Sequence, residues 1–427
     1  MAKHGKNRVV RPVPTAQRKI EIQIPLRMTD VLEGARNTFF ELCVDAGRAV
    51  LDVLMEEDRE ALCGPKGAHV PERRAYRYGS TSSEITLGGR RVVMRRPRVR
   101  SVAGEELSLR SFEHVAGRDP LDAHTLSAIG AGVSGRGYAQ TLEVLPRGER
   151  ERSVSQSSVS RRFVALTQQQ MSEWLTTPIG DRNVRVVMID GKVFRDHTVL
   201  IALGIAENGE KIVLGLREGT TENSTVTRDL LRDIIERGVA SDQPILFVID
   251  GGKGIRKAIR ECFGSLAWVQ RCRIHKLRNV LEYLPQSQRA SVQRRLRQAW
   301  SATSFELGLK QLERLAQSLD SEHPSAAASL REGMAETLTL QRLGLVDGAL
   351  ARTLRTTNPI ENLMDSTGRY TRNVKRWRSG SMILRWVSAA IRRAQQSFRR
   401  IRGHRDLPAL LRALTKAQSM DTAKVAA

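Results

Sequence analysis

Hydrophobic residues recur at the spacing of helices in some parts of the chain and at the spacing of strands in others. This pattern predicts helices towards both ends and a mixed sheet between them. From Val31 to Leu62, apolar residues recur at helical spacing and predict an amphipathic helix. Ile85–Leu87 and Arg91–Met94 flank a Gly-Gly pair and predict a hairpin, whose second arm continues to Arg100. Residues 122–170 are expected to form three helices.

The middle of the chain has the pattern of strands. Three of them, predicted at Val184–Asp190, Thr198–Ala206 and Lys211–Leu216, suit an antiparallel meander. A helix (Ser224–Gly238), a strand (Ile245–Asp250), a helix (Gly254–Phe263) and a short strand (Ala267–Gln270) are predicted next. This is the order of the ribonuclease H-like fold, in which the first and fourth strands are neighbours. The expected fold class is therefore α/β, with a ribonuclease H-like mixed-sheet core.

Residues from His275 to about Leu350 have helical periodicity and predict an all-helical insertion, whose helices separate at Pro285 and His323-Pro324. The predicted organisation has six parts: a basic N-terminal region (1–120), a helix-turn-helix-like DNA-binding region (121–180), the first part of the core (181–275), the insertion (276–350), a C-terminal core helix with a third acid (351–400) and a basic tail (401–427).

Two predicted strands end in the same tripeptide, Ile-Asp-Gly, which contains Asp190 in one and Asp250 in the other. If these strands are parallel neighbours, both carboxylates lie at one sheet edge, where open α/β sheets place their sites. A divalent cation such as Mg²⁺ would remove their mutual repulsion. The alternative is that Asp-Gly is turn chemistry. Two copies in so basic a chain favour the metal site.

The charge balance points to a polyanionic partner. The chain has 70 Lys and Arg against 46 Asp and Glu, a net charge of +24, and nucleic acid is the commonest partner of such a protein. No run is apolar enough to span a bilayer or to serve as a signal peptide, so a cytoplasmic protein without a membrane partner is expected. Four cysteines in 427 residues are expected to be reduced thiols.

Two segments are candidates for DNA contact. The hairpin carries a run of arginines, of which Arg95, Arg96 and Arg98 are predicted to contact the duplex backbone, with a solvated face as the equal alternative. A helix opening near Ser153 presents hydroxyls and then arginines, which suits a recognition helix with Ser157, Arg161 and Arg162 on DNA. A Ser-capped surface helix is the alternative, since residues 145–152 are long for a helix-turn-helix turn.

A third acid is predicted at Glu361. Asn358 is expected to be the N-cap of a helix with Pro359 at its first position. Glu361 would then also fit a capping box, a structural role compatible with a catalytic one. Asp365, one turn later, is the alternative third acid.

Four motifs occur in an order that resembles mutator-type bacterial insertion-sequence transposases of the Asp-Asp-Glu superfamily. They contain Asp190, Asp250, the segment Gln270–His275 and the segment Arg355–Glu361. The resemblance spans about residues 125 to 390. It implies that Asp190, Asp250 and Glu361 form a metal-binding catalytic triad, and Cys272 and His275 match the family's Cys-x-x-His signature. Asn362, where the family more often has Arg, is a departure.

The resemblance implies a bacterial, nucleoid-associated DNA transposase that binds the ends of an insertion sequence and catalyses strand cleavage and strand transfer. Two Mg²⁺ ions, with Mn²⁺ as an alternative, would be held with Asp190 as the bridging ligand. The expected partners are the terminal inverted repeats, target DNA and further copies of the chain in a homo-oligomer. A zinc site at Cys272 and His275 with Cys262 is less favoured than core packing or DNA-strand positioning.

Two other functions fit parts of the same sequence pattern. A structure-specific DNA nuclease of the same fold would keep the acids, and a helix-turn-helix regulator would keep the DNA-binding helix without catalysis. Short inverted repeats flanking the gene would favour the transposase over both.

Overall fold

The structure is a computed structural model that describes residues 35–68, 74–87, 90–117, 121–141, 155–219 and 224–426. The chain divides into two compact units, one comprising residues 1–129 and 133–163 and the other residues 130–132 and 164–427. The division falls inside one helix. Each unit has its own sheet.

The first unit contains a three-stranded antiparallel sheet with strand order β1-β2-β3. Strands β1 (Ala75–Leu87) and β2 (Arg90–Ser101) form the predicted hairpin, and β3 (Glu106–Leu107) pairs with β2. Helix α2 (Ala35–Cys63), which confirms the predicted amphipathic helix, buries Leu51 and Met55 in the same core as Ile85, Met94 and Val99 of the hairpin. Helix α3 (Arg110–Gly117) follows the sheet.

Of three helices predicted between residues 122 and 170, the described residues contain two α-helices and a 3-10 turn. These are α4 (Leu121–Gly130), η1 (Tyr138–Thr141) and α5 (Gln156–Thr176). Gly135 and Gly137 precede η1, and glycine is unfavourable in a helix interior. The segment predicted to connect the helices, residues 145–152, lies outside the described residues.

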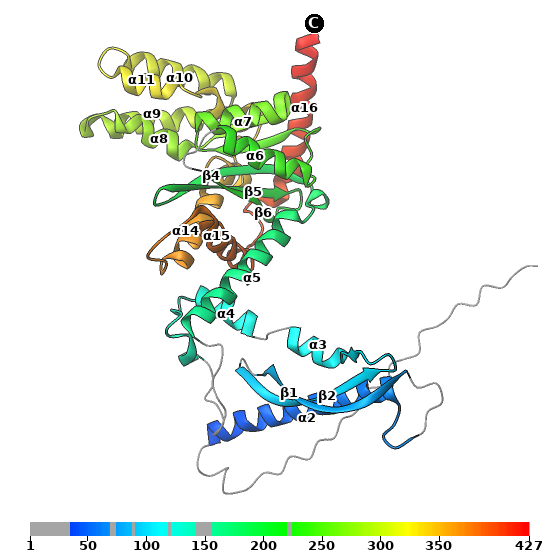
Figure 1. Ribbon diagram of the computed structural model, residues 1–427. Helices are drawn as coiled ribbons and strands as arrows, with labels where there is room; N and C mark the ends of the chain where they lie inside the picture. The colour runs from blue at the N-terminus through cyan, green and yellow to red at the C-terminus, as the bar shows by residue number, and fades with distance from the viewer. Residues whose placement is uncertain are drawn as a thin grey trace, which may run out of the picture. The chain divides into compact units, whose positions relative to one another are not determined.

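The second unit is built on a five-stranded mixed sheet with strand order β6-β5-β4-β7-β8 (Figure 1). Its strands are β4 (Val184–Phe194), β5 (His197–Ala206), β6 (Lys211–Gly219), β7 (Ile245–Ile249) and β8 (Ala267–Arg271). The first three are antiparallel, while β7 is parallel to both β4 and β8. The expectation that the first and fourth strands of this region are neighbours is confirmed.

Alternating residues of the central strands face two different cores, as the pleat of a strand requires. Val187 and Ile189 pack with α6 (Ser224–Glu236) and α7 (Lys253–Phe263) on one face. Val186 and Met188 pack on the other face with α14 (Asn358–Thr371), α15 (Gly380–Gln395) and α16 (Leu407–Ala426). Figure 1 shows α6 and α7 on one side of the sheet and α14 and α15 on the other. The central strands are therefore buried on both faces.

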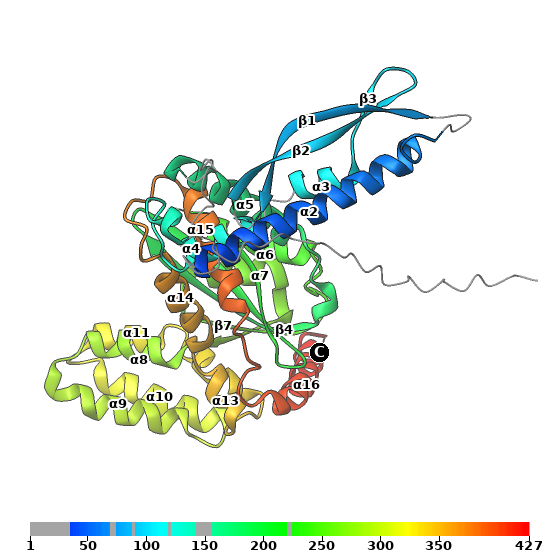
Figure 2. The ribbon, with the colours of Figure 1, turned by 90° about the horizontal axis from the view of Figure 1, so that it is seen from below.

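The segment after β8 is all-helical, as predicted. It comprises α8 (Arg273–Glu282), α9 (Gln286–Trp300), α10 (Phe305–Leu319), α11 (Pro324–Arg331), η4 (Ala335–Leu338), α12 (Thr339–Arg342) and α13 (Ala349–Leu354). Helices α8 to α11 share a core of their own, and Figure 2 shows them projecting from the sheet. Pro285 caps α9 and His323 caps α11, which confirms both predicted breaks.

Within the segment expected to be a basic tail, residues 401–426 include the turn η5 (His404–Asp406) and helix α16. Leu407, Leu410 and Leu414 of α16 are buried in the core beside the sheet. The basic residues of this segment drew attention away from apolar residues that recur at helical spacing. Across the described residues, no helix combines the length and hydrophobicity that a membrane crossing requires.

Candidate active site

Asp190 and Asp250 lie at the same level of neighbouring strands. The last parallel pair between β4 and β7 joins Ile189 to Ile249, so each aspartate directly follows that pair. Asp250 follows the end of β7, but Asp190 is not at a strand tip as predicted, because β4 continues in its pairing with β5 as far as Phe194. Each carboxylate accepts a nearby backbone N–H, from Gly191 at 2.9 Å and from Gly252 at 3.2 Å.

Gly251, the residue after Asp250, fits its position only without a side chain. Its φ is +118°, and a Cβ there would collide with the Arg271 guanidinium. Arg271 donates to the Gly251 carbonyl at 3.1 Å and to the Glu332 carbonyl at 3.0 Å. The loop that carries Asp250 is thereby tied to the end of α11 in the helical insertion.

Glu361 lies in the first turn of α14, but the predicted cap of this helix is wrong. Thr357, not Asn358, occupies the N-cap position, because its carbonyl accepts the N–H groups of Ile360 and Glu361. Pro359, predicted at the first position of the helix, is its second residue. The Thr357 hydroxyl donates to the Glu361 carboxylate at 2.6 Å and so orients it.

Cys272 and His275 lie beside Glu361. Cys272 follows β8 and caps α8, where its N–H donates to the Ile249 carbonyl next to Asp250. His275 Nδ1 is 3.8 Å from the Glu361 carboxylate and 3.4 Å from the Thr357 hydroxyl. The predicted signature pair and the predicted third acid therefore meet, although they are far apart in sequence.

The electrostatics of this cluster favour a charged imidazole. The hydrogen bond with Cys272 raises the pKa of His275 to about 8 against the effect of burial, and the charges of Glu361 and Asp250 add to the increase. Burial alone would raise the pKa of the Cys272 thiol, but hydrogen bonds with His275 and Thr357 outweigh it and leave that pKa below its ordinary value. His275 thus places a positive charge near two of the three candidate acids.

The donor set nearest to a closed metal site is Cys272, His275 and Glu361, whose ligand atoms lie within 4.8 Å of one another. Asp190 and Asp250 do not belong to this group, since Glu361 is turned towards Thr357 and His275. Cys262, the third ligand of the less favoured zinc site, does not belong to it either; it is a residue of α7 and packs against the core on that face of the sheet.

Lys192 was not identified from the sequence. It lies two residues after Asp190 on β4, and strand periodicity therefore places both side chains on one face. Its ammonium donates to the Met364 carbonyl of α14 at 2.6 Å. Burial lowers its pKa despite the nearby charges of Asp365 and Asp190. Asp365, the alternative third acid, is exposed on α14. The period-two spacing from Asp190 could have revealed Lys192.

The predicted DNA-contacting residues all lie in the first unit. Arg96 and Arg98 pair with Glu106, at 3.1 Å and 2.6 Å, and Arg95 donates to the Ser80 hydroxyl at 3.0 Å. In α5, Ser157 and Arg161 are exposed while Val159 and Phe163 are buried; Arg162 is half-buried. The hairpin arginines therefore have protein partners, and the start of α5 has one exposed polar face.

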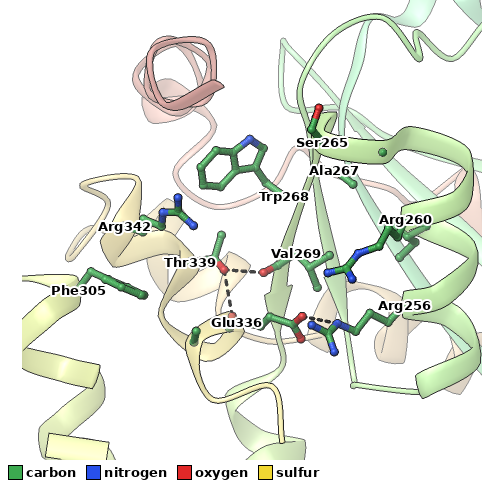
Figure 3. A pocket seen from close by; sticks show the side chains of 13 residues that line it. Arg256, Arg260, Ser265, Ala267, Trp268, Val269, Phe305, Glu336, Thr339 and Arg342 are labelled. Atoms are coloured by element: carbon green, nitrogen blue, oxygen red, sulfur yellow. Dashed lines mark hydrogen bonds and ion pairs between the residues drawn. The ribbon is translucent and has the colours of Figure 1, made fainter. Parts of the chain in front are cut away.

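A separate hollow of about 240 Å³ lies at the first half of β8 and is not close to the acids. Figure 3 shows Arg256 of α7 pointing to Glu336 of η4, with which it forms an ion pair. The Arg342 guanidinium lies 5.0 Å from the centre of the Trp268 ring. Cys272 follows the opposite end of the same strand. This hollow is therefore distinct from the candidate active site.

The profile described as "Transposase, Mutator family" matches residues 28–400, and the chain belongs to this family of insertion-sequence transposases.

Three relatives illustrate the range of similarity. The transposase for insertion sequence element IST2 of Acidithiobacillus ferrooxidans is 28% identical over 186 residues, which cover 44% of this chain and 61% of that protein. The transposase for IS256 in transposon Tn4001 of Staphylococcus aureus is 26% identical over 80% of this chain and 87% of its own length. That for IS406 of Burkholderia multivorans is 27% identical over 85% and 94%.

Proposed function

We propose that the chain is a metal-dependent DNA transposase with a ribonuclease H-like catalytic core, which binds the ends of an insertion sequence, cuts them and joins them to target DNA. The observation that carries the proposal is the placement of Asp190 and Asp250 directly after one parallel residue pair on the central strands. Membership of the mutator family supports it.

The residues present fit a hard divalent cation. Asp190, Asp250 and Glu361 would hold Mg²⁺, or Mn²⁺ in its place, because carboxylate oxygens are the ligands these ions prefer. When bound, the metal supplies Lewis-acid chemistry for phosphoryl transfer. The N–H groups of Gly191 and Gly252 and the Thr357 hydroxyl each orient one of the carboxylates. Glu361 would exchange its contacts with Thr357 and His275 for the metal.

The remaining charged groups of the site would hold the DNA strand. His275 carries a positive charge below about pH 8 and is placed beside Glu361, where it can donate to a phosphate oxygen. One chain contains one set of these acids, whereas an element has two ends. The proposal therefore includes a homo-oligomer of at least two chains on paired end DNA, which sedimentation of that complex would measure.

The acids provide the direct test. Asp190→Asn, Asp250→Asn and Glu361→Gln should each lower cleavage and strand transfer by on the order of 10³-fold or more while DNA affinity stays near that of the wild type. Chelation of the metal should do the same. Asp242→Asn, at an exposed position before β7, is the matched control and should keep full activity.

Wild-type cleavage by any of the three variants would remove that residue from the triad. Strand transfer separates the candidate functions: a nuclease would cut end DNA without joining it to a target, and a regulator would bind without cutting.

A further inference from the structure

Two hollows of the second unit flank the start of α14. One, of about 710 Å³, is lined by five cationic side chains and no carboxylate; the cations are Lys211, Arg352, Arg399, Arg400 and Arg402. The amides of Asn358 and Asn362 complete its polar wall. These residues come from β6, α13, α14 and the segment after α15, so no single run of sequence produces the hollow.

The second hollow, of about 690 Å³, runs along the exposed side of α14. Its cations are Lys192, Arg369 and Arg372, and Asp365 is its one carboxylate. Lys192 ties this hollow to the candidate active site, since it follows Asp190 on β4 and donates to a carbonyl of α14. The positive charges of the second hollow therefore begin beside Asp190 and continue away from it along α14.

Both hollows are lined by Asn362, the residue after Glu361. They consequently meet at the first turn of α14, next to the third candidate acid. The cations therefore stand on either side of Asn362.

The cations of this region have few protein partners. Apart from Lys192, which faces Asp190 and Asp365, none of them forms an ion pair with a carboxylate in the part of the chain that the structure describes. In the hollow of Figure 3, by contrast, Arg256 forms an ion pair with Glu336. Like charges gathered without counter-charges favour an anionic ligand that brings several charges at once.

We propose that the two hollows form one groove that binds the phosphodiester backbone of DNA and leads a strand past Asn362 to the acids. This inference rests on the proposed function and identifies the path of its DNA substrate. Cations on both sides of Asn362 suit a ligand that passes the site and continues beyond it, as a DNA strand does. Contacts to phosphates carry no sequence information, so the groove should bind all sequences alike.

The test compares two pairs of exposed arginines with equal charge change. Arg399→Gln with Arg400→Gln removes two groove cations, and Arg294→Gln with Arg297→Gln removes two from α9, which line neither hollow. Affinity of the full chain for a fluorescent duplex of arbitrary sequence is measured against salt without Mg²⁺. The groove variant should flatten the logarithmic salt slope by about 1.8 units, so the wild type loses about twelvefold more affinity than the variant between about 50 and 200 mM salt.

The α9 control should keep the wild-type slope, and Arg399→Lys with Arg400→Lys should retain it too. If the groove variant proves unfolded, Arg369→Gln and Arg372→Gln, on the other side of Asn362, give the same readout. A wild-type slope in the folded groove variants, or an equal change in the α9 control, overturns the proposal. So does competition by polyglutamate as effective as by DNA, which would identify a protein-docking surface.

Binding without metal also separates this inference from the proposed function. If Asp190→Asn still cleaves DNA while the groove variants lose affinity, the triad is wrong and the groove is right. If the acids are essential but the groove variants bind DNA normally, the triad is right and the groove is wrong.

Discussion

The arginines of β2 and those around Asn362 carry the same charge in different surroundings. Arg96 and Arg98 follow one another along one strand and share Glu106, and Arg98 also lies 5.1 Å from the Tyr78 ring centre. The groove cations come from separate segments and, apart from Lys192, lack carboxylate partners among the described residues. A run of arginines in sequence therefore marks charge, while the fold decides which charges are available to a ligand.

The largest effect on DNA binding is expected in α5, which is predicted to contact DNA bases and not only the phosphate backbone. Arg161→Ala should reduce the preference for end DNA over random DNA by about 1–3 kcal/mol, roughly 5- to 150-fold, because a base-edge contact is lost. Ser157→Ala should act in the same direction. Competition binding with both DNAs measures the ratio, and equal losses on the two would show that α5 is no recognition helix.

A smaller effect is expected in the hairpin. Arg95→Gln should weaken binding to all sequences and flatten the salt slope by about one unit, since Arg95 donates only to a serine hydroxyl. Replacing Arg98 should change the slope less, because its guanidinium already makes two hydrogen bonds to Glu106.

Glu106→Gln is the converse variant, as it releases Arg96 and Arg98 and should steepen the slope. If Arg98→Gln and Arg95→Gln flatten it equally, pairing with Glu106 does not limit these arginines, and the contrast with the groove fails.

The last effect, on stability and not on DNA binding, concerns a third kind of cation, whose hydrogen bonds go to carbonyl oxygens. Lys276 is fully buried and donates to the Ser329 and Glu332 carbonyls, both at 2.5 Å. Burial, aided by the Arg271 charge, lowers its pKa from 10.5 to about 8. Between these values the unfolded chain binds more protons than the folded one, so this group's contribution to stability rises with pH across that window.

Lys276→Met should abolish that rise and cost about 1–3 kcal/mol below it, because two buried carbonyls lose their donor. Urea unfolding at about pH 8 and pH 10 measures both quantities, with exposed Lys310→Met of α10 as the control. A variant that keeps the wild-type pH dependence would assign the effect to another group.

The elements of the second unit could be predicted from sequence because its strands are short apolar runs with clear turns. Every strand from β4 to β8 was located, and the neighbouring placement of Asp190 and Asp250 followed from their order. The first half of β1 was missed, since Ser80 to Ser83 carry no apolar alternation. That strand is held by its partner β2 and not by its own pattern.

Only the residues of the candidate site that lie in recognised motifs could be predicted, and not their contacts. Thr357 lay within a recognised motif, but its contact with Glu361 depends on which carbonyl opens α14, and the sequence favoured Asn358 as the cap. The groove could not be predicted at all, because its cations are brought together by tertiary packing from positions as distant as Lys211 and Arg402. Local patterns find strands and caps, whereas surfaces assembled from remote segments require the fold.

The late position of α14 has a consequence for synthesis of the protein. Asp250 and Glu361 are 111 positions apart, with the whole helical insertion between them. At about 5–20 residues per second, a ribosome needs roughly ten seconds to add this interval. During that time the emerging chain has both sheet aspartates but not Glu361, the third acid proposed above, so we expect a nascent transposase to be unable to cut DNA. For the same reason we expect no cleavage by the product of a message truncated in the insertion.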